Sequence, residues 1–146
     1  MNLLRPSLLF LACIAPCLHA APLDPSLIGC WRAAKIVLYA QDGSKMEDTS
    51  RRCALQFKED QLESACLTAR GMARVTYQYR IVRPNFYETT MAASTFKTDL
   101  IGATREYEYH VDGDRLVTVT KPPASATGSP AAAVRVTSES ARTPCP

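Results

Sequence analysis

The chain has 146 residues, of which 47% are hydrophobic and 21% charged, and its formal net charge is +3 at pH 7. A chain of this length fits one globular domain with a core of its own. A net charge so close to balance gives no case for nucleic acid or an anionic membrane as the partner.

Residues 1–20 are predicted to be a secretory signal peptide. Arg5 is their only charged residue, Leu8–Leu18 is an apolar run, and Leu18-His19-Ala20 offers a cleavage site. The run is shorter than the roughly 20 apolar residues that cross a bilayer, so a retained membrane anchor is not expected. Removal of Arg5 with the signal lowers the formal charge from +3 to +2.

The domain that remains, residues 21–146, is expected in the periplasm or outside the cell, with no transmembrane segment. A lipid anchor on Cys13 is a less favoured alternative, because Phe10 is atypical of the motif that precedes a lipidated cysteine. Cys17 follows a proline and fits that motif less well.

Four cysteines remain in the domain, an even number in an oxidising compartment, which predicts two disulfides. Two short strands around Glu59-Asp60 would place Cys53 opposite Cys66 on a closely spaced pair, which leaves Cys30 to join Cys145. The other two pairings stay open, because Glu-Asp lacks the glycine of a tight hairpin and the register could slip. A zinc site is not favoured, because no Cys-x-x-Cys spacing occurs.

Alternation of apolar and polar residues predicts a chain of short strands. Asp112-Gly113 is the strongest hairpin turn, Pro122–Pro130 is expected to be a flexible loop, and Thr95–Gly102 fits either a short strand or a loop. A short helix is conceivable at Pro25–Ile28. The predicted strands are Trp31–Tyr39, Arg52–Lys58, Leu62–Thr68, Ala73–Val82, Phe86–Ala93, Arg105–Val111, Arg115–Lys121 and Val134–Thr137.

Eight or nine such strands joined mainly by tight turns predict an all-β antiparallel meander that closes into a small barrel, with a β-sandwich as the alternative. Eight strands enclose a space that side chains fill or that holds one small ligand. The residues expected on the inner face are Trp31, Val37, Tyr39, Leu55, Phe57, Leu62, Val75, Tyr77, Tyr79, Ile81, Tyr107, Tyr109, Val117 and Val119.

Gly29-Cys30-Trp31 opens the first predicted strand. This placement resembles the Gly-x-Trp signature of the lipocalin-like (calycin) barrels and identifies residues 21–146 as a divergent, bacterial-type member. In that family an arginine from a late strand often packs over the tryptophan, and Arg135 is the candidate by position, with Arg115 second. The family's Thr-Asp-Tyr motif is not matched, because this chain has Thr98-Asp99-Leu100.

The function expected from these patterns is non-enzymatic binding of a small apolar or amphipathic ligand inside the barrel. The alternative for the aromatic residues is that they fill the core. No catalytic group, cofactor motif or metal site is predicted, because the domain's single histidine, His110, shares the polar face of Glu106 and Glu108. The expected ligand-binding residues are Trp31, Tyr39, Tyr77, Tyr79, Tyr107 and Tyr109.

Two further functions remain open. The chain also resembles periplasmic barrel inhibitors of secreted metalloproteases, which begin with a similar strand and carry two cysteines a hairpin apart. In those proteins the N-terminal segment enters the protease cleft, and here it would be Ala21–Leu27, kept extended by two prolines. An envelope-associated structural role is the other alternative, with Arg51-Arg52, Arg70 and Arg74 facing an anionic polymer.

Overall fold

The computed structural model describes residues 22–40, 42–120 and 135–146. The predicted signal peptide and the predicted Pro122–Pro130 loop lie outside these residues. Within the described ranges, no helix is long and apolar enough to cross a membrane. The elements are β1 (Gly29–Tyr39), β2 (Lys45–Asp48), β3 (Cys53–Phe57), β4 (Gln61–Thr68), β5 (Gly71–Arg83), β6 (Phe86–Ser94), the 3-10 turn η1 (Thr98–Leu100), β7 (Thr104–Asp112), β8 (Arg115–Thr120) and β9 (Arg135–Thr143).

The sheet closes on itself through β1. Gly29–Arg32 of this strand pairs with β3, while its other edge pairs with β9 from Cys30 to Tyr39. The strands between follow one another as an antiparallel meander, so β1 and β3–β9 form a closed eight-stranded barrel. The predicted barrel is confirmed, and the β-sandwich alternative is wrong because the first strand hydrogen-bonds both of its neighbours.

The extra strand β2 was not predicted. It pairs with Ile36–Tyr39 of β1, beyond the point at which β3 ends. All four of its residues are exposed, so it carries no alternating apolar pattern that would reveal a strand. The ambiguous stretch Thr95–Gly102 contains η1 rather than a strand, and residues 25–27 form a turn rather than a short helix.

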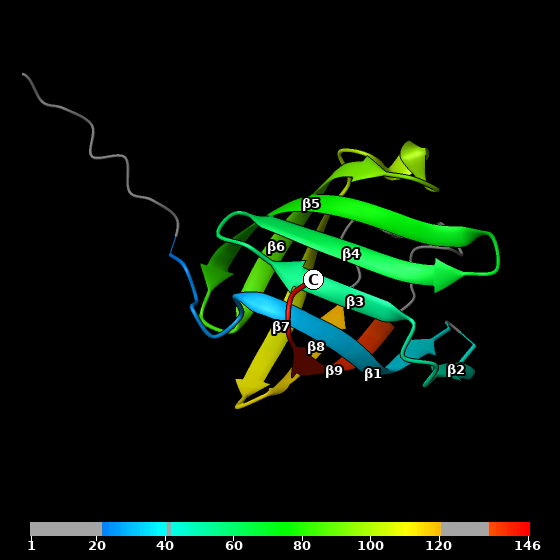
Figure 1. Cartoon of the computed structure of the whole chain (residues 1–146), viewed down its shortest axis with the longest axis horizontal. Helices are drawn as coiled ribbons and strands as arrows, with labels where there is room; N and C mark the ends of the chain where they lie inside the picture. The colour runs from blue at the N-terminus through cyan, green and yellow to red at the C-terminus, as the bar shows by residue number, and fades with distance from the viewer. Residues whose placement is uncertain (1–21, 41, 121–134) are drawn as a thin grey trace, which may run out of the picture.

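The barrel has two different ends (Figure 1). The closed end, on the left of the view, contains residues 22–28 and the β3–β4, β5–β6 and β7–β8 turns. The open end, on the right and at the top, contains the β4–β5 turn, η1 and β2. The hydrophobic core of Leu27, Trp31, Phe57, Leu62, Tyr79, Tyr87, Tyr109 and Leu116 fills the closed half.

A bulge changes which side of β1 faces the barrel interior. Its register with β9 shifts between Ala33 and Lys35. Because one unpaired residue reverses the alternation, the second half of the strand presents the opposite set of side chains. Lys35 bonds the exposed Glu47, so Tyr39, on the same face of the strand and 38% exposed, faces outward as well. The sequence-based placement of Tyr39 on the inner face is therefore wrong. Val37 shares the face of Lys35 and Tyr39 in the β1–β9 register, yet its side chain is buried, at 7% exposed.

The inner face of β8 was also predicted wrongly. Leu116 and the threonines at 118 and 120 are buried, whereas Val117 and Val119 are only partly buried on the outer side. The valines were predicted on the inner face because they are apolar, but the threonine side chains face the interior instead. The interior of this barrel is therefore partly polar.

Two disulfides cross-link the barrel. Cys53 faces Cys66 across the β3–β4 ladder, and their Cα atoms lie 4.0 Å apart. Cys30 is joined to Cys145, 115 residues later in the chain, and so ties the first barrel strand to the C-terminal tail. Both bonds are compatible with an oxidising compartment.

We expect the two disulfides to stabilise the barrel unequally. In the chain-entropy model, the bond with a sequence separation of 115 contributes about 5 kcal/mol, and the bond with a separation of 13 about 3 kcal/mol. Urea unfolding of C30S/C145S and C53S/C66S variants measures both contributions. Equal losses, or a larger loss from C53S/C66S, would contradict the loop-length account.

Candidate functional site

Trp31 seals the closed end of the barrel. Its ring is fully buried, and its Nε1–H donates a hydrogen bond of 2.8 Å to the carbonyl oxygen of Leu27. Leu27 is itself fully buried at the end of the turn that begins at Asp24. The residues before β1 thus fold over the tryptophan and satisfy its one polar atom, as a buried indole requires.

The guanidinium of Arg142 stacks on the Trp31 ring. Its guanidinium carbon lies 4.1 Å from the centre of the Trp31 ring. The same group donates hydrogen bonds of 2.8 Å to the carbonyl oxygen of Ser26 and 2.9 Å to that of Ile28. A planar, multiply donating cation is suited to stacking and bridging at once. The arginine therefore holds the turn, the first strand and the last strand together.

Gly29 is required by this arrangement for two reasons. Its φ of +123° lies in a region that residues with side chains rarely adopt. A Cβ at this position would also lie 3.0 Å from Nη1 of Arg142. The glycine of the Gly-Cys-Trp signature thus gives the guanidinium room to reach the backbone.

The predicted partners of the tryptophan are wrong. Arg135 lies over the ring of Tyr39, 5.5 Å from its centre, and Arg115 pairs with Glu139 at 2.9 Å. The prediction failed because the last strand was expected to end at Thr137, whereas it continues to Thr143. The register Trp31↔Arg142 lies in the part of the strand that was not foreseen.

Aromatic rings fill the closed half beyond the tryptophan. Phe57 lies edge-on to Tyr79 and Tyr87, with centroid distances of 5.3 and 5.5 Å, and Tyr87 stacks on Tyr107 at 5.0 Å. The hydroxyl of Tyr79 donates to the carbonyl oxygen of Lys58, and that of Tyr109 to a carboxylate oxygen of Asp24, each at 2.6 Å. The interior of this half of the barrel is therefore filled by packed side chains.

Asp24 anchors the turn below the tryptophan. Burial would raise the pKa of its carboxyl, but hydrogen bonds from the Ser26 hydroxyl, the Tyr109 hydroxyl and the Ser26 backbone N–H outweigh that effect and lower the pKa below its ordinary value. The carboxylate is therefore charged at neutral pH. Because the folded-state pKa is lowered, the stabilisation from this group is present above the unfolded-state pKa and is lost as the pH falls through the folded-state value.

The open half contains a cavity of about 160 Å³ beneath η1. Five of its lining residues are apolar and the others are polar or cationic, with no carboxylate among them. Tyr77 and Tyr107 stand on its wall, and Thr89, which pairs with Tyr79 on β5 and Arg105 on β7, also lines it. The complete lining is Val75, Tyr77, Thr89, Met91, Phe96, Lys97, Leu100, Ala103, Arg105 and Tyr107.

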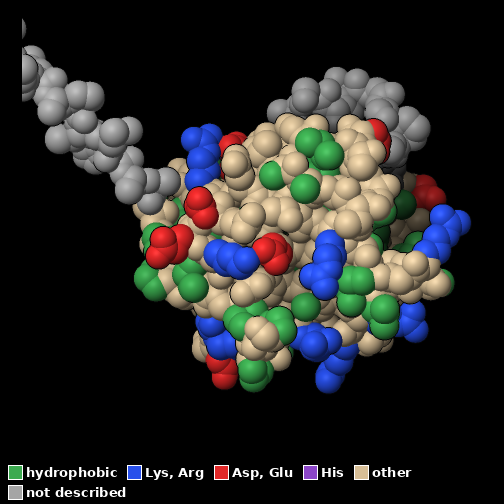
Figure 2. Space-filling view, turned by 45° about the horizontal axis from the view of Figure 1, so that its top comes forward, with side chains coloured by type: hydrophobic (Ala, Val, Ile, Leu, Met, Phe, Trp, Pro, Cys, Tyr) green, Lys and Arg blue, Asp and Glu red, His purple; other side chains and the backbone are tan. Residues whose placement is uncertain are grey.

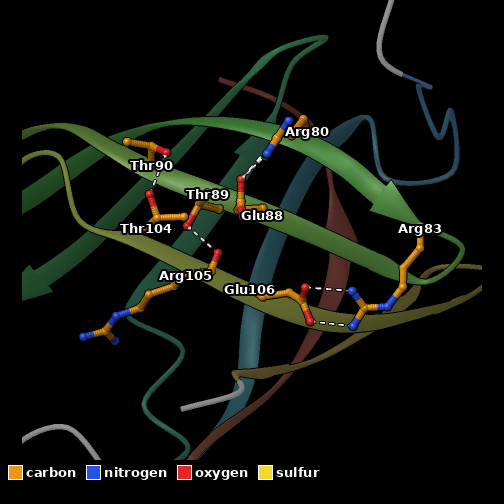
Figure 3. Close-up of polar contacts among 8 residues, drawn as sticks. All are labelled: Arg80, Arg83, Glu88, Thr89, Thr90, Thr104, Arg105 and Glu106. Carbon is orange, nitrogen blue, oxygen red and sulfur yellow. Dashed lines mark hydrogen bonds and ion pairs between the residues drawn. The ribbon is translucent and has the colours of Figure 1, made fainter. Parts of the chain in front are cut away.

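Arg105 brings a positive charge to this cavity. It pairs in register with the buried Thr89, which places it on the inward side of β7, and its side chain extends away from the ion pairs on the outer face (Figure 3). Within the described residues it has no ion pair with a carboxylate, in contrast to the neighbouring Arg80 and Arg83. Its charge acts on the phenols of Tyr77 and Tyr107.

The two cavity phenols are neutral hydrogen-bonding groups. Burial raises the pKa of Tyr77 to about 12 and also raises that of Tyr107, although the positive charge of Arg105 acts in the opposite direction on both. Thr89 and Thr120 form side-chain hydrogen bonds with the Tyr107 hydroxyl. At neutral pH the cavity therefore combines neutral hydroxyls with cations, and its wall contains no proton-accepting carboxylate.

The six predicted ligand-binding residues do not share one site. Trp31, Tyr79 and Tyr109 belong to the packed closed half, whereas Tyr77 and Tyr107 line the open cavity. Tyr39 is 38% exposed on the outer side of β1.

Sequence reasoning missed three important residues. Tyr87 lies at the centre of the core, and its alternation with Glu88 could have indicated an inward position. Arg142 precedes Cys145 by three residues, so the expected bond to Cys30 already placed it near Trp31. Arg105 gave no signal, because an arginine at the start of a strand is ordinarily solvated.

No constellation typical of catalysis appears in the described part of the chain. His110 is exposed and pairs in register with Val117 on the outer side of the sheet. Across residues 22–40, 42–120 and 135–146, no group of three or more His, Cys, Asp or Glu side chains is placed to hold a metal ion.

Comparisons with known proteins support the fold. No family model matches the chain, and no curated protein matches it. Among solved structures, a lipocalin-like protein from Bacteroides uniformis ATCC 8492 aligns with a TM-score of 0.53 at 10% identity, over 81% of this chain and 99% of the other. An uncharacterized protein from Bacteroides eggerthii DSM 20697 aligns with a TM-score of 0.50 at 9% identity, over 80% and 99%.

These likenesses, together with the closed barrel, show that the chain has a lipocalin-like fold, as the Gly29-Cys30-Trp31 placement predicted. At such low identity they show the fold alone, and the site must be argued from this chain's own residues.

Replacement of Arg142 by alanine is expected to destabilise the protein by about 2–4 kcal/mol, because two charge-assisted hydrogen bonds and the stacking on Trp31 are lost together. Urea unfolding followed through Trp31, the only tryptophan, measures the loss. Arg115→Ala is the matched control, since it removes one exposed ion pair and should cost less than about 1 kcal/mol. Equal effects of the two substitutions would contradict the sealing role of Arg142.

Proposed function

We propose that this protein is an exported, non-enzymatic binding protein that holds a small amphipathic acid in its open cavity. The observation that carries the proposal is the composition of the cavity wall. Apolar residues, led by Val75, Met91 and Phe96, meet two phenols and the cations Arg105 and Lys97. Ligand pockets commonly combine an apolar lining with a few polar groups that orient the ligand.

The charge of the wall favours an anionic head group. Arg105 and Lys97 both line the cavity, and no carboxylate lies among the lining residues. A carboxylate or a similar anion would accept charge-assisted hydrogen bonds from the guanidinium, and the hydroxyl of Tyr77 is a neutral donor on the same wall.

The size of the cavity restricts the apolar part of the ligand. A closed cavity of about 150 Å³ in a protein holds a molecule of benzene's size, so a space of about 160 Å³ takes one small ring or a short alkyl chain. Burial of that group contributes about 25 cal/mol per Å² before ordering costs are subtracted. The ligand class is thus a small aromatic or short-chain acid.

Export is supported by two observations, the predicted signal peptide over residues 1–20 and the two disulfides. In this proposal the domain from residue 21 onward acts in the periplasm or outside the cell.

The inhibitor alternative has less support. An inhibitory arm must be able to leave its own barrel, but the turn that begins at Asp24 packs against it. Tyr109 donates to the Asp24 carboxylate, Arg142 binds the carbonyl oxygen of Ser26, and Leu27 is fully buried under Trp31. Removing this segment would therefore open the closed end as well.

Octanoate binding, measured by calorimetry with the mature protein, tests the ligand proposal. Octanoate is expected to bind more tightly than octanol, and Arg105→Gln should weaken octanoate binding about tenfold while leaving octanol unchanged, because one charge-assisted hydrogen bond is lost. Arg83→Gln is the matched control, since that side chain pairs with Glu106 on the outer face. No octanoate binding, or equal losses in the two variants, would contradict the proposal.

A further inference from the structure

The charges of the barrel are divided between its two ends. On the closed half, arginines are neutralised by neighbouring carboxylates. Arg83 forms a bidentate ion pair with Glu106, with donor–acceptor distances of 2.6 and 2.8 Å (Figure 3). Arg80 forms an ion pair with Glu88 at 2.8 Å. The nearly balanced net charge therefore conceals an uneven distribution.

Within the described residues the open end carries an excess of cations, although Glu47 and Asp48 of β2 and Asp99 of η1 are exposed there as well. The chain contains no Asp or Glu between Glu63 and Glu88, a stretch that includes the whole β4–β5 turn. Arg70 and Arg74 are exposed in it, and within the described residues neither forms an ion pair. Arg51-Arg52 and Lys97 are likewise exposed and are not part of an ion pair in those ranges, although Arg52 lies close enough to Asp48 to lower the pKa of that carboxyl.

These cations adjoin one another in space. The backbone N–H of Leu67 donates to the carbonyl oxygen of Arg52 at 2.9 Å, and Leu67 faces Met72 across the β4–β5 hairpin. The backbone N–H of Arg74 donates to the hydroxyl of Thr95, and the backbone N–H of Thr95 donates to the carbonyl oxygen of Arg74. Thr95 directly precedes Phe96. We define this continuous surface as the basic rim, and its residues are Arg51, Arg52, Leu67, Arg70, Met72, Arg74, Phe96 and Lys97.

Large apolar side chains stand between the cations of the basic rim. Leu67 is 53% exposed, Met72 49% and Phe96 57%. Several Lys and Arg side chains lie on the right of Figure 2, the side on which the β4–β5 hairpin turns, with hydrophobic and a few acidic side chains among them. Exposed apolar side chains also occur singly at the closed end, at Leu23 and Val82, but in the basic rim they lie among cations. An apolar boundary next to anions would accept both kinds of group.

We propose that the basic rim docks the open end of the barrel on the surface of a bilayer that contains anionic phospholipids. Lys and Arg side chains at such a surface each strengthen binding about fivefold, and apolar tips add affinity by entering the boundary between head groups and acyl chains. Nucleic acid is the less favoured partner, because single strands are bound on several stacked aromatic rings and the rim has one, Phe96.

The opposite end sets the orientation of the docked protein. Glu59, Asp60, Asp112 and Asp114 lie in or beside the closed-end turns and would be repelled by an anionic surface. The cavity beneath η1 then opens toward the bilayer. The rim shares Phe96 and Lys97 with the cavity wall, whereas Leu67, Arg70, Met72 and the arginines at 51 and 52 lie outside the cavity lining and test docking separately from ligand binding.

Co-sedimentation of the mature protein with vesicles tests the docking. We expect binding to vesicles of phosphatidylcholine with 30% phosphatidylglycerol, little binding to pure phosphatidylcholine, and loss of binding at high salt. R70S/R74S should reduce partitioning at least tenfold and L67S/M72S, which changes no cavity residue, at least threefold. R80S/R83S removes the same charge from the closed half and should leave partitioning within twofold of wild type.

Three results would overturn the docking proposal. They are equal binding to charged and uncharged vesicles, equal losses for R70S/R74S and R80S/R83S, and vesicle binding that L67S/M72S leaves unchanged. The last result would indicate attraction to any anionic polymer instead. Circular dichroism and thermal melting of each variant confirm that it is folded. Arg105→Gln should bind vesicles like wild type, which separates a failure of docking from a failure of ligand binding.

Discussion

The stacking of Arg142 on Trp31 is the interaction on which the rest of this structure depends. The two residues come from the last and first strands of the barrel, and the arginine also binds two backbone carbonyls of the turn that precedes β1. A sheet closes only if its terminal strands are held in one register. Here the stack, the Leu27 carbonyl and the nearby Cys30–Cys145 bond fix that register together.

The two ends of the barrel differ in how their interiors are filled. The closed half is filled by Phe57, Tyr79, Tyr87 and Tyr109 in edge-on or tilted contacts, and its phenols find acceptors at its edge. Toward the open end the inward residues become smaller and more polar, as along β8, where the buried Leu116 is followed by the buried Thr118 and Thr120. The cavity lies where this change occurs, so the same alternation that builds the core also provides the ligand wall.

Much of this architecture follows from period-two alternation, because burial on one side of a strand is a local property. The register of Cys53 with Cys66 could be counted outward from Glu59-Asp60, and the structure has that register. The outward position of Tyr39 could not be predicted, since it depends on an unpaired residue in β1, and a bulge has no clear signal in a single sequence. The same limit applied to the threonine-lined face of β8, where polar residues face inward.

The functional features were harder to predict than the barrel because they depend on residues far apart in the chain. Arg142 reaches Trp31 only through the β1–β9 ladder, and Arg105 reaches Tyr77 only through the inner faces of β5 and β7. The unpaired cations of the open end are scattered in sequence, and folding brings them to one rim. Net charge summed over the whole chain therefore gave no indication of a partner.

The most direct test of a sealed end and a binding end is a nuclear magnetic resonance titration of ¹⁵N-labelled protein with octanoate. The account predicts that backbone amide signals of Thr89, Met91 and Tyr107 shift in a saturable way, whereas the single indole N–H signal, that of Trp31, stays in place. Shifts centred on Trp31 and Leu27, or no saturable shift anywhere, would contradict it.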